Sequence, residues 1–241
     1  RYRGPARGRP PLADVWLPDG PGPHPSVVWV HGGGFAVGHR QMKPMRYLAT
    51  ACRRAGMAVL SFDYRLVFRG GRLDEAVDDV VAAVEWWASQ GDAYRLDPRR
   101  VALGGLSAGG CLMLLAAPRL QDRLAAAVSV FSLYDIAGLD RGPARLLGRL
   151  AAGPDPALRR ARSPVAAAPL HRPLLVLHGT DDSLVPVAQA QAYVAQRQAA
   201  GLPTTARIYP GEPHAFFNVP QAPIAARAAA DVTAWLRERL A

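Results

Sequence analysis

Short apolar runs alternate with amphipathic helical stretches along almost the whole chain, and this alternation limits the possible folds more than any other feature. One run, Ser26–Val30 (SVVWV), is typical of a strand that is buried on both faces of a sheet. The strongest helical stretch, 74–91, repeats apolar residues at helical spacing with acidic residues between them. Parallel strands must be joined by crossover connections, usually helices. The pattern therefore predicts an α/β fold with a mostly parallel sheet and helices on both faces.

Seven strands and five long helices are expected. The strands are predicted at 13–17, 26–30, 58–62, 101–103, 126–131, 174–178 and 205–209, and the helices at 42–55, 74–91, 108–117, 187–200 and 223–240. A turn is predicted at 18–25, because its prolines are incompatible with a helix or a central strand. The stretch 137–163, rich in Arg, Pro and Ala, is predicted to be an insert with two or three short helices.

Length and composition favour one domain spanning 1–241, with 137–163 as a small cap insert. Half of the 241 residues are hydrophobic, which is enough for a sizeable core. Two cysteines exclude a disulfide scaffold and a structural zinc site, and Cys111 is expected to be a small buried residue rather than a disulfide partner of Cys52. We expect neither a metal nor an organic cofactor.

No apolar run approaches the ~18 residues of a transmembrane helix, so no transmembrane segment is expected. We expect a cytoplasmic protein. The chain starts at Arg1 rather than at Met, so the sequence leaves open whether a signal peptide has been removed. The oligomeric state cannot be read from the sequence.

The net charge of +10 is concentrated in two stretches. Residues 1–10 hold four arginines and no acid, and residues 137–163 hold six arginines against two aspartates. Such stretches can attract nucleic acid or another anionic partner. Neither is interleaved with aromatic side chains that could stack on bases, so we favour a solvated tail and a solvated lid and expect no nucleic-acid partner.

Ligands of parallel α/β sheets bind beyond the carboxyl ends of the strands, and the loop there at 105–109 (GLSAG) joins an expected strand to an expected helix. Gly-x-Ser-x-Gly in this position places a serine on a sharp turn with its hydroxyl exposed. Gly105 and Gly109 avoid clashes with the neighbouring backbone, and the N–H of Ala108 lies at the helix start without an intrahelical acceptor. We interpret Ser107 as a nucleophile; the alternative is an idle serine in a glycine-rich helix start.

A second loop, His31 followed by three glycines, comes directly after the expected strand 26–30. Consecutive glycines allow backbone N–H groups to face a common point without obstruction by side chains. Acyl-transfer enzymes need such donors where negative charge develops on the substrate oxygen. A flexible turn is the alternative, although three glycines at the end of a buried strand are entropically costly for a turn alone.

Two further loops supply a candidate acid and a candidate base. In the segment 178–182 (HGTDD), either Asp181 or Asp182 could orient a histidine and stabilise its imidazolium form. His214 follows the last expected strand and is a candidate general base. A solvated aspartate and a surface histidine are the alternatives. The chain order Ser, Asp, His is that of the α/β-hydrolase triad.

With these motifs the chain resembles α/β-hydrolase-fold carboxylesterases that carry an HGGG oxyanion motif, a group with hormone-sensitive-lipase-like and bacterial acetyl- and feruloyl-esterase-like branches. The resemblance covers about residues 13–240 and rests on HGGGF (31–35), DYRL (63–66), GLSAGG (105–110), HGTDDSLVP (178–186) and PHAF (213–216). It implies a catalytic triad in which the acid is the last residue of HGxxD, and an oxyanion hole of three N–H groups. The implied triad is Ser107, Asp182 and His214, and the implied hole is formed by Gly33, Gly34 and Ala108.

The chain departs from the hormone-sensitive-lipase-like pattern in three places. Leu106 stands before the nucleophile where an acid is usual, and DYRL is followed by Val67 and Phe68 rather than by Ala-Pro. The strand before HGGG begins about 25 residues into the chain, so we expect no N-terminal cap helices. These departures favour a small, minimally capped esterase over a lipase. Formamidase-like relatives carry an aromatic residue at the position of Gly34, which weakens that option.

The resemblance implies a serine hydrolase that cleaves small carboxylic esters, mainly short-chain ones, through an acyl-enzyme on Ser107. An amidase, an arylformamidase or a peptidase with the same triad stays open, because the motifs do not separate ester from amide substrates. A non-catalytic binding protein on a hydrolase fold is a third reading. It predicts decay of the triad or of the glycine loop, and neither motif has decayed.

Several residues near the expected site are predicted to have structural roles. Asp63, Arg65 and Asp135 lie near strand ends and could line the site, but we favour structural roles in holding loops, and Trp87 is expected in the core. In the insert, three leucines at helical spacing predict a lid helix with an apolar underside that lines an acyl pocket, while the arginines face outward. These leucines are Leu146, Leu147 and Leu150.

Overall fold

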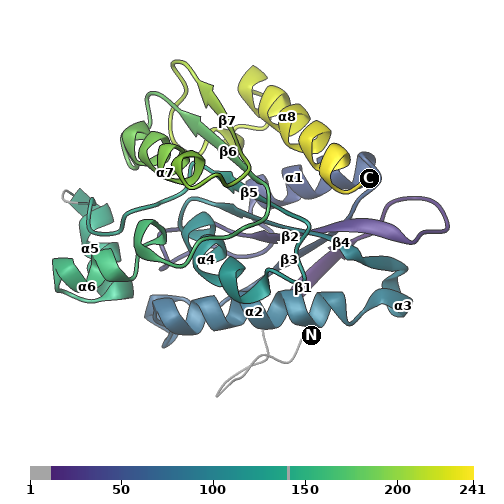
Figure 1. Cartoon of the computed structure of the whole chain (residues 1–241), viewed down its shortest axis with the longest axis horizontal. Coiled ribbons are helices and arrows are strands. Elements are labelled where there is room, and N and C mark those ends of the chain that lie inside the picture. Colours follow the sequence, from purple (N-terminus) through teal and green to yellow (C-terminus); the bar gives the residue numbers. More distant parts are fainter. Residues whose placement is uncertain (1–11, 140–141) are drawn as a thin grey trace.

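The computed structural model describes residues 12–139 and 142–241 and contains a seven-stranded sheet in the order β1-β3-β2-β4-β5-β6-β7 (Figure 1). The strand β1 pairs antiparallel with β3, and the other neighbours are parallel. The predicted α/β fold with a mostly parallel sheet is confirmed. The strands are β1 (Ala13–Trp16), β2 (His24–Val30), β3 (Ala58–Phe62), β4 (Leu96–Leu106), β5 (Ala126–Val130), β6 (Leu174–Gly179) and β7 (Thr204–Tyr209).

Helices cover both faces of the sheet (Figure 1). On one face, α1 (Lys43–Arg54) and α8 (Pro223–Arg239) pack against alternate residues of the central strands. On the other face lie α2 (Leu73–Ala88), α4 (Ala108–Ala116) and α7 (Val187–Ala199). Every residue of β3 and β5 is buried, which explains why these strands are mostly apolar, with one serine each, rather than alternating.

Short helical segments complete the structure. They are α3 (Gly91–Tyr94), α5 (Gly142–Ala152), α6 (Pro156–Ala161), η1 (Val67–Arg69), η2 (Ala117–Leu120), η3 (Pro164–Ala166) and η4 (Phe216–Asn218). The segment α3 is missing from the sequence prediction, which extended the preceding helix to residue 91. Within the described ranges, no helix is long and apolar enough to cross a membrane.

The strand β4 is much longer than the predicted strand 101–103, which was expected to stop at two glycines. Gly104 stays in the strand because the indole ring of Trp29 lies against it, so a Cβ there would be 2.3 Å from a ring carbon. Gly104 also pairs with Trp29 on one side and with Val128 on the other. The glycines therefore serve close packing between neighbouring strands rather than strand termination.

The predicted turn at 18–25 is also partly wrong, because β2 begins at His24 and includes Pro25. The pairing of β2 with β4 shifts register between His24 and Ser26. A proline, which has no N–H to donate, is tolerated at such an irregularity. Further along the chain, the predicted core position of Trp87 is confirmed, since its indole is fully buried and donates to Ser26 Oγ at 3.0 Å.

The Arg-rich stretch 137–163 contains α5 and α6, and its arginines do not all face solvent as predicted. Arg159 is buried and donates to the carbonyl oxygens of Gly153 and Pro154. Arg160 forms an ion pair with Asp135, the residue that was expected to hold a loop. The other Arg-rich stretch, residues 1–10, lies outside the described residues. The division into one domain with a cap insert stays a prediction.

Candidate active site

Ser107 lies on a sharp turn between β4 and α4 and has the unusual backbone angles φ 53° and ψ −121°. This turn needs small neighbours, as the sequence predicted. A Cβ on Gly109 would be 2.3 Å from the carbonyl oxygens of Val30 and His31, so α4 can begin this close to β2 only with glycine there. The strained turn is the local geometry expected of an exposed nucleophile.

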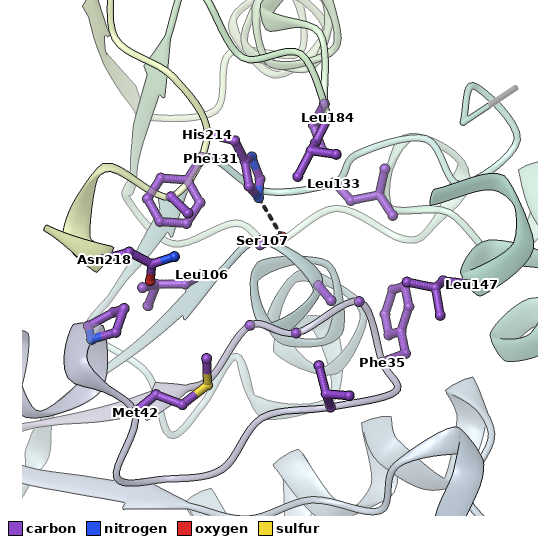
Figure 2. Close-up of a pocket in the computed structure, with 18 of the residues that line it drawn as sticks. Phe35, Met42, Leu106, Ser107, Phe131, Leu133, Leu147, Leu184, His214 and Asn218 are labelled. Carbon is purple, nitrogen blue, oxygen red and sulfur yellow. Dashed lines mark hydrogen bonds between the residues drawn. The ribbon is translucent and has the colours of Figure 1, made fainter. Parts of the chain in front are cut away.

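His214 connects Ser107 to Asp182 through two hydrogen bonds. Its Nε2 lies 3.0 Å from Ser107 Oγ, and its Nδ1 lies 2.6 Å from Asp182 Oδ2. Figure 2 shows the imidazole next to Ser107 and pointing at it, with the dashed line marking their hydrogen bond. The backbone reaches this arrangement through Ala215, a non-glycine residue with φ 56° directly after His214. Three loops that are distant in sequence therefore meet at one point beyond the strand ends.

The structure brings Asp182 to His214 and leaves the neighbouring Asp181 exposed. Asp182 is buried, and its Oδ1 accepts from the N–H groups of Leu184 at 3.0 Å and Val185 at 2.7 Å. Asp181 instead accepts from the hydroxyl of Thr180, its neighbour in the turn. Only one of the two aspartates can therefore orient His214.

The environment of Asp182 keeps its carboxyl group ionised. Burial opposes the charge, but hydrogen bonds from His178 and His214 outweigh this and hold the pKa of Asp182 below its usual range. The His178 ring lies 3.1 Å from the carboxylate and is completely buried. Sequence analysis did not assign any role to His178. The only available signal was its place in HGxxD, four residues before the acid.

The glycine loop after β2 has a conformation that ordinary residues adopt rarely. Gly33 and Gly34 have φ values of 122° and 60°, and even Phe35 has φ 66°. A Cβ on Gly33 would be 2.0 Å from the carbonyl oxygen of Val37, so no larger residue fits there without rearrangement. The Gly33 carbonyl accepts from the N–H groups of Ala36 and Val37, both at 3.1 Å. Within the described residues, the N–H groups of Gly33 and Gly34 form no such bond.

Side chains of the DYRL segment hold this loop in place. The hydroxyl of Tyr64 donates to the His31 carbonyl at 3.1 Å, and the two rings stack with centroids 4.2 Å apart. Asp63 accepts two hydrogen bonds from Arg40, and Arg65 pairs with Asp79 at 2.9 Å. The predicted structural roles of Asp63 and Arg65 are therefore confirmed.

A cavity of about 420 Å³ opens at Ser107, and its walls are mostly apolar. In Figure 2, Phe131, Met42 and Asn218 lie on one side of Ser107, and Leu133 and Leu147 lie on the other. None of the described lining residues is Asp, Glu, Lys or Arg. The full lining is Gly32, Gly33, Gly34, Phe35, Val37, Met42, Pro44, Met45, Leu106, Ser107, Ala108, Phe131, Leu133, Leu139, Leu147, Gly148, Leu184, Val185, His214, Ala215 and Asn218.

The prediction for the three leucines of the insert is correct for one of them. Leu147 lines the cavity from α5, together with Gly148. Leu146 is 58% exposed and Leu150 is half-buried, and neither is part of the lining. Sequence analysis also missed Phe131, Leu133 and Asn218 in the lining. No local motif marks them: Phe131 and Leu133 lie in the loop after β5, and Asn218 lies in η4.

A family model described as the alpha/beta hydrolase fold matches residues 27–218. The chain belongs to the α/β-hydrolase fold family. A hyperthermophilic esterase from the archaeon Pyrobaculum calidifontis superposes with a TM-score of 0.85 at 26% identity, over 98% of this chain and 84% of that one. Similarity within this family thus extends to the strand ends that carry the site.

Sequence relatives within this family include two bacterial proteins. A probable carboxylic ester hydrolase, LipM, from Mycobacterium tuberculosis is 32% identical, over 87% of this chain and 54% of the relative. An acetyl esterase from Salmonella paratyphi B is 30% identical, over 51% of this chain and 38% of the relative. The chain spans about half the length, or less, of these curated relatives.

Proposed function

We propose that this α/β-hydrolase chain is a serine carboxylesterase that acts on small, neutral esters. The observation that carries the proposal is the hydrogen-bonded chain from Asp182 through His214 to Ser107, which ends at an apolar cavity. A nucleophile, a base and an orienting acid within hydrogen-bond distance are the requirement for acyl transfer to serine. The relatives that are named as ester hydrolases support the same reaction.

In the proposed mechanism, Ser107 Oγ attacks the ester carbonyl carbon while His214 Nε2 accepts the hydroxyl proton. Asp182 holds Nδ1–H of His214 and stabilises the imidazolium that forms. His214 then returns the proton to the leaving alkoxide, and the acyl group stays on Ser107. A water molecule, activated by His214 in the same way, attacks the acyl-enzyme, and the acid is released with Ser107 restored.

The tetrahedral intermediates of both steps carry a negative oxygen, which needs fixed donors. We propose the N–H groups of Gly33, Gly34 and Ala108 for this role. The first two belong to the glycine loop, which faces the cavity, and the third lies in the first turn of α4, where helix N–H groups have no intrahelical acceptor. Donors that are already oriented need no reorganisation when the charge develops.

The cavity favours neutral substrates of small to moderate size. A charged group of the substrate would lose its hydration there without meeting a counter-charge among the described lining residues. We therefore propose small apolar esters as the substrate class, without a cofactor. We also propose that residues 1–241 form one domain with 137–163 as its cap insert. A cytoplasmic location is part of the same proposal.

A panel of p-nitrophenyl esters, from acetate to octanoate, tests this function against the matching anilides and N-formyl arylamines. The account predicts turnover of the short esters with kcat/KM at least 100-fold above that of any amide in the panel. A preference for the anilides or formamides would replace the esterase by an amidase or formamidase with the same triad. No turnover in the whole panel would favour a binding protein.

A further inference from the structure

A second histidine, His178, contacts Asp182, the acid of the proposed triad, from the interior of the protein. It lies near the end of β6 and is completely buried. Its Nε2 is 2.9 Å from the carbonyl oxygen of Val185 and 3.1 Å from Asp182 Oδ2. Both neighbours are hydrogen-bond acceptors. The Nε2 atom must therefore carry the proton and donate it, since two acceptors and an unprotonated nitrogen would repel each other.

The other ring nitrogen of His178 indicates that the residue is not there for packing alone. Its Nδ1 is buried and has no hydrogen-bond partner among the described residues. Leaving a buried polar atom unpaired costs free energy, and an apolar side chain of similar volume would avoid that cost. Histidine provides an N–H donor, Nε2–H, that faces Asp182, and an apolar residue at this position would not.

The carboxylate of Asp182 is held by four donors. Oδ1 accepts from the N–H groups of Leu184 and Val185, and Oδ2 lies within reach of His178 and His214. With both oxygens engaged, rotation of the carboxylate plane would break hydrogen bonds. Among the described residues, the donors that reach Oδ2 are His214 and His178.

We propose that His178 is a positioning residue of the triad, which donates Nε2–H to Asp182 and fixes the carboxylate for His214. The inference rests on the proposed function. His178 does not touch the substrate, since it is absent from the lining of the cavity. By also donating to Val185, it ties the end of β6 to the turn that carries Asp182. The ionised state of Asp182 is consistent with this additional donor.

Two substitutions at position 178 distinguish the effect of losing the N–H donor from the effect of changing the side-chain volume. His178→Met keeps a similar volume and removes the donor, whereas His178→Gln can place an amide N–H close to the Nε2 position. We expect His178→Met to lower kcat for a short ester by about 10- to 100-fold with KM within about threefold, the size of a lost hydrogen bond to a charged group. His178→Gln should recover most of this loss.

His24→Met is the matched control, because His24 is also buried and its Nε2 also has no hydrogen-bond partner among the described residues, but it lies at the start of β2, away from the site. It should leave kcat unchanged. A folded His178→Met enzyme with kcat within threefold of wild type would overturn the proposal, and so would a Gln variant as impaired as the Met variant. An inactive wild-type enzyme would instead contradict the proposed function.

The tautomer of His178 gives a test that needs neither activity nor a folded variant. In ¹⁵N NMR spectra of the wild-type protein, we expect the Nε2 of His178 to be protonated and its Nδ1 to be unprotonated. The His178→Gln spectrum assigns the signals by their disappearance, and sequential assignment through the backbone of the wild-type protein assigns them if that variant does not fold. A proton on Nδ1 alone would overturn the proposal.

Discussion

The side chain of Leu147, on α5, lies directly over Gly34 of the glycine loop. A Cβ added to Gly34 would be 2.6 Å from Leu147 Cδ1. Both residues line the cavity at Ser107. The insert therefore forms part of the cavity wall. Leu147 also leaves no room for a side chain at position 34, whose N–H is one of the proposed oxyanion donors.

Changing the size of Leu147 should change the preference for acyl chains. Leu147→Ala enlarges the cavity and should shift the optimum toward longer chains, while Leu147→Phe should restrict turnover to acetate and propionate. The neighbouring Leu146→Ala is the control, because Leu146 is exposed and outside the lining. Profiles of kcat/KM against chain length check this. An unchanged profile in both Leu147 variants would mean that α5 does not bound the acyl group.

Gly34→Ala should lower kcat by about 100-fold, because its N–H would move as the new methyl group meets Leu147 and as alanine resists φ 60°. Adding Leu147→Ala removes the clash but not the backbone strain, so the double variant should recover part of the loss. The double-mutant cycle measures this coupling. Strictly additive effects would show that the contact does not influence the donor.

Asp182→Asn should reduce kcat by about 10⁴-fold, as expected when the acid of such a triad can no longer hold the histidine tautomer. Asp181→Asn, one residue away, should change kcat by less than about threefold, because Asp181 is exposed and its carboxylate accepts from the neighbouring Thr180 rather than from His214. Steady-state kinetics of the two variants form a matched pair. A reversal of the two effects would mean that the loop presents the other aspartate to His214.

Salt should hardly change kcat/KM for neutral esters between about 0.01 M and 1 M, because long-range charge does not steer them. Two arginines of the insert also have internal partners: Arg160 pairs with Asp135, and Arg162 pairs with Asp74 at 3.1 Å. Stopped-flow or plate assays at several salt concentrations check this. A steep loss of activity toward anionic esters alone as salt rises would make the insert an electrostatic funnel.

Stability should fall as the pH drops from 6.5 to 4 because of His31. Burial lowers the pKa of this histidine to about 4, so between those values the unfolded chain binds a proton that the native protein excludes. Over this window the contribution is about 3 kcal/mol. Urea unfolding at several pH values should show a shallower dependence of stability on pH for His31→Asn than for the wild-type protein. Equal slopes in the two proteins would contradict the assignment.

The sequence predicts most of this fold because most of the central strands are local apolar runs and helices such as α2 have a local period. It also predicts which residues meet at the site, since Ser107 and the glycine loop belong to motifs whose position at strand ends determines where they lie. Packing between residues that are distant in the sequence is harder to predict. The strand 101–103 was expected to end before Gly104, because the packing of the Trp29 ring against Gly104 cannot be inferred from the local sequence.

The insert shows the same limit at side-chain level. Helical spacing predicts that Leu146, Leu147 and Leu150 share one helix face. Of these three, Leu147 alone lines the cavity, because that depends on how α5 is oriented relative to the cavity. Arg159 resembles a solvated charge in the sequence, and only the folded loop supplies the two carbonyl groups that it binds. The contact of His178 with Asp182 likewise depends on how the turn after β6 closes.

The central claim, that Ser107 is a nucleophile activated by His214, is tested most directly by a fluorophosphonate probe with mass analysis of the labelled peptide. The account predicts one probe per chain, attached at Ser107, with the rate of labelling strongly reduced in His214→Ala and no labelling in Ser107→Ala. Labelling at another residue, or an unlabelled wild-type protein that is folded by circular dichroism, would contradict it.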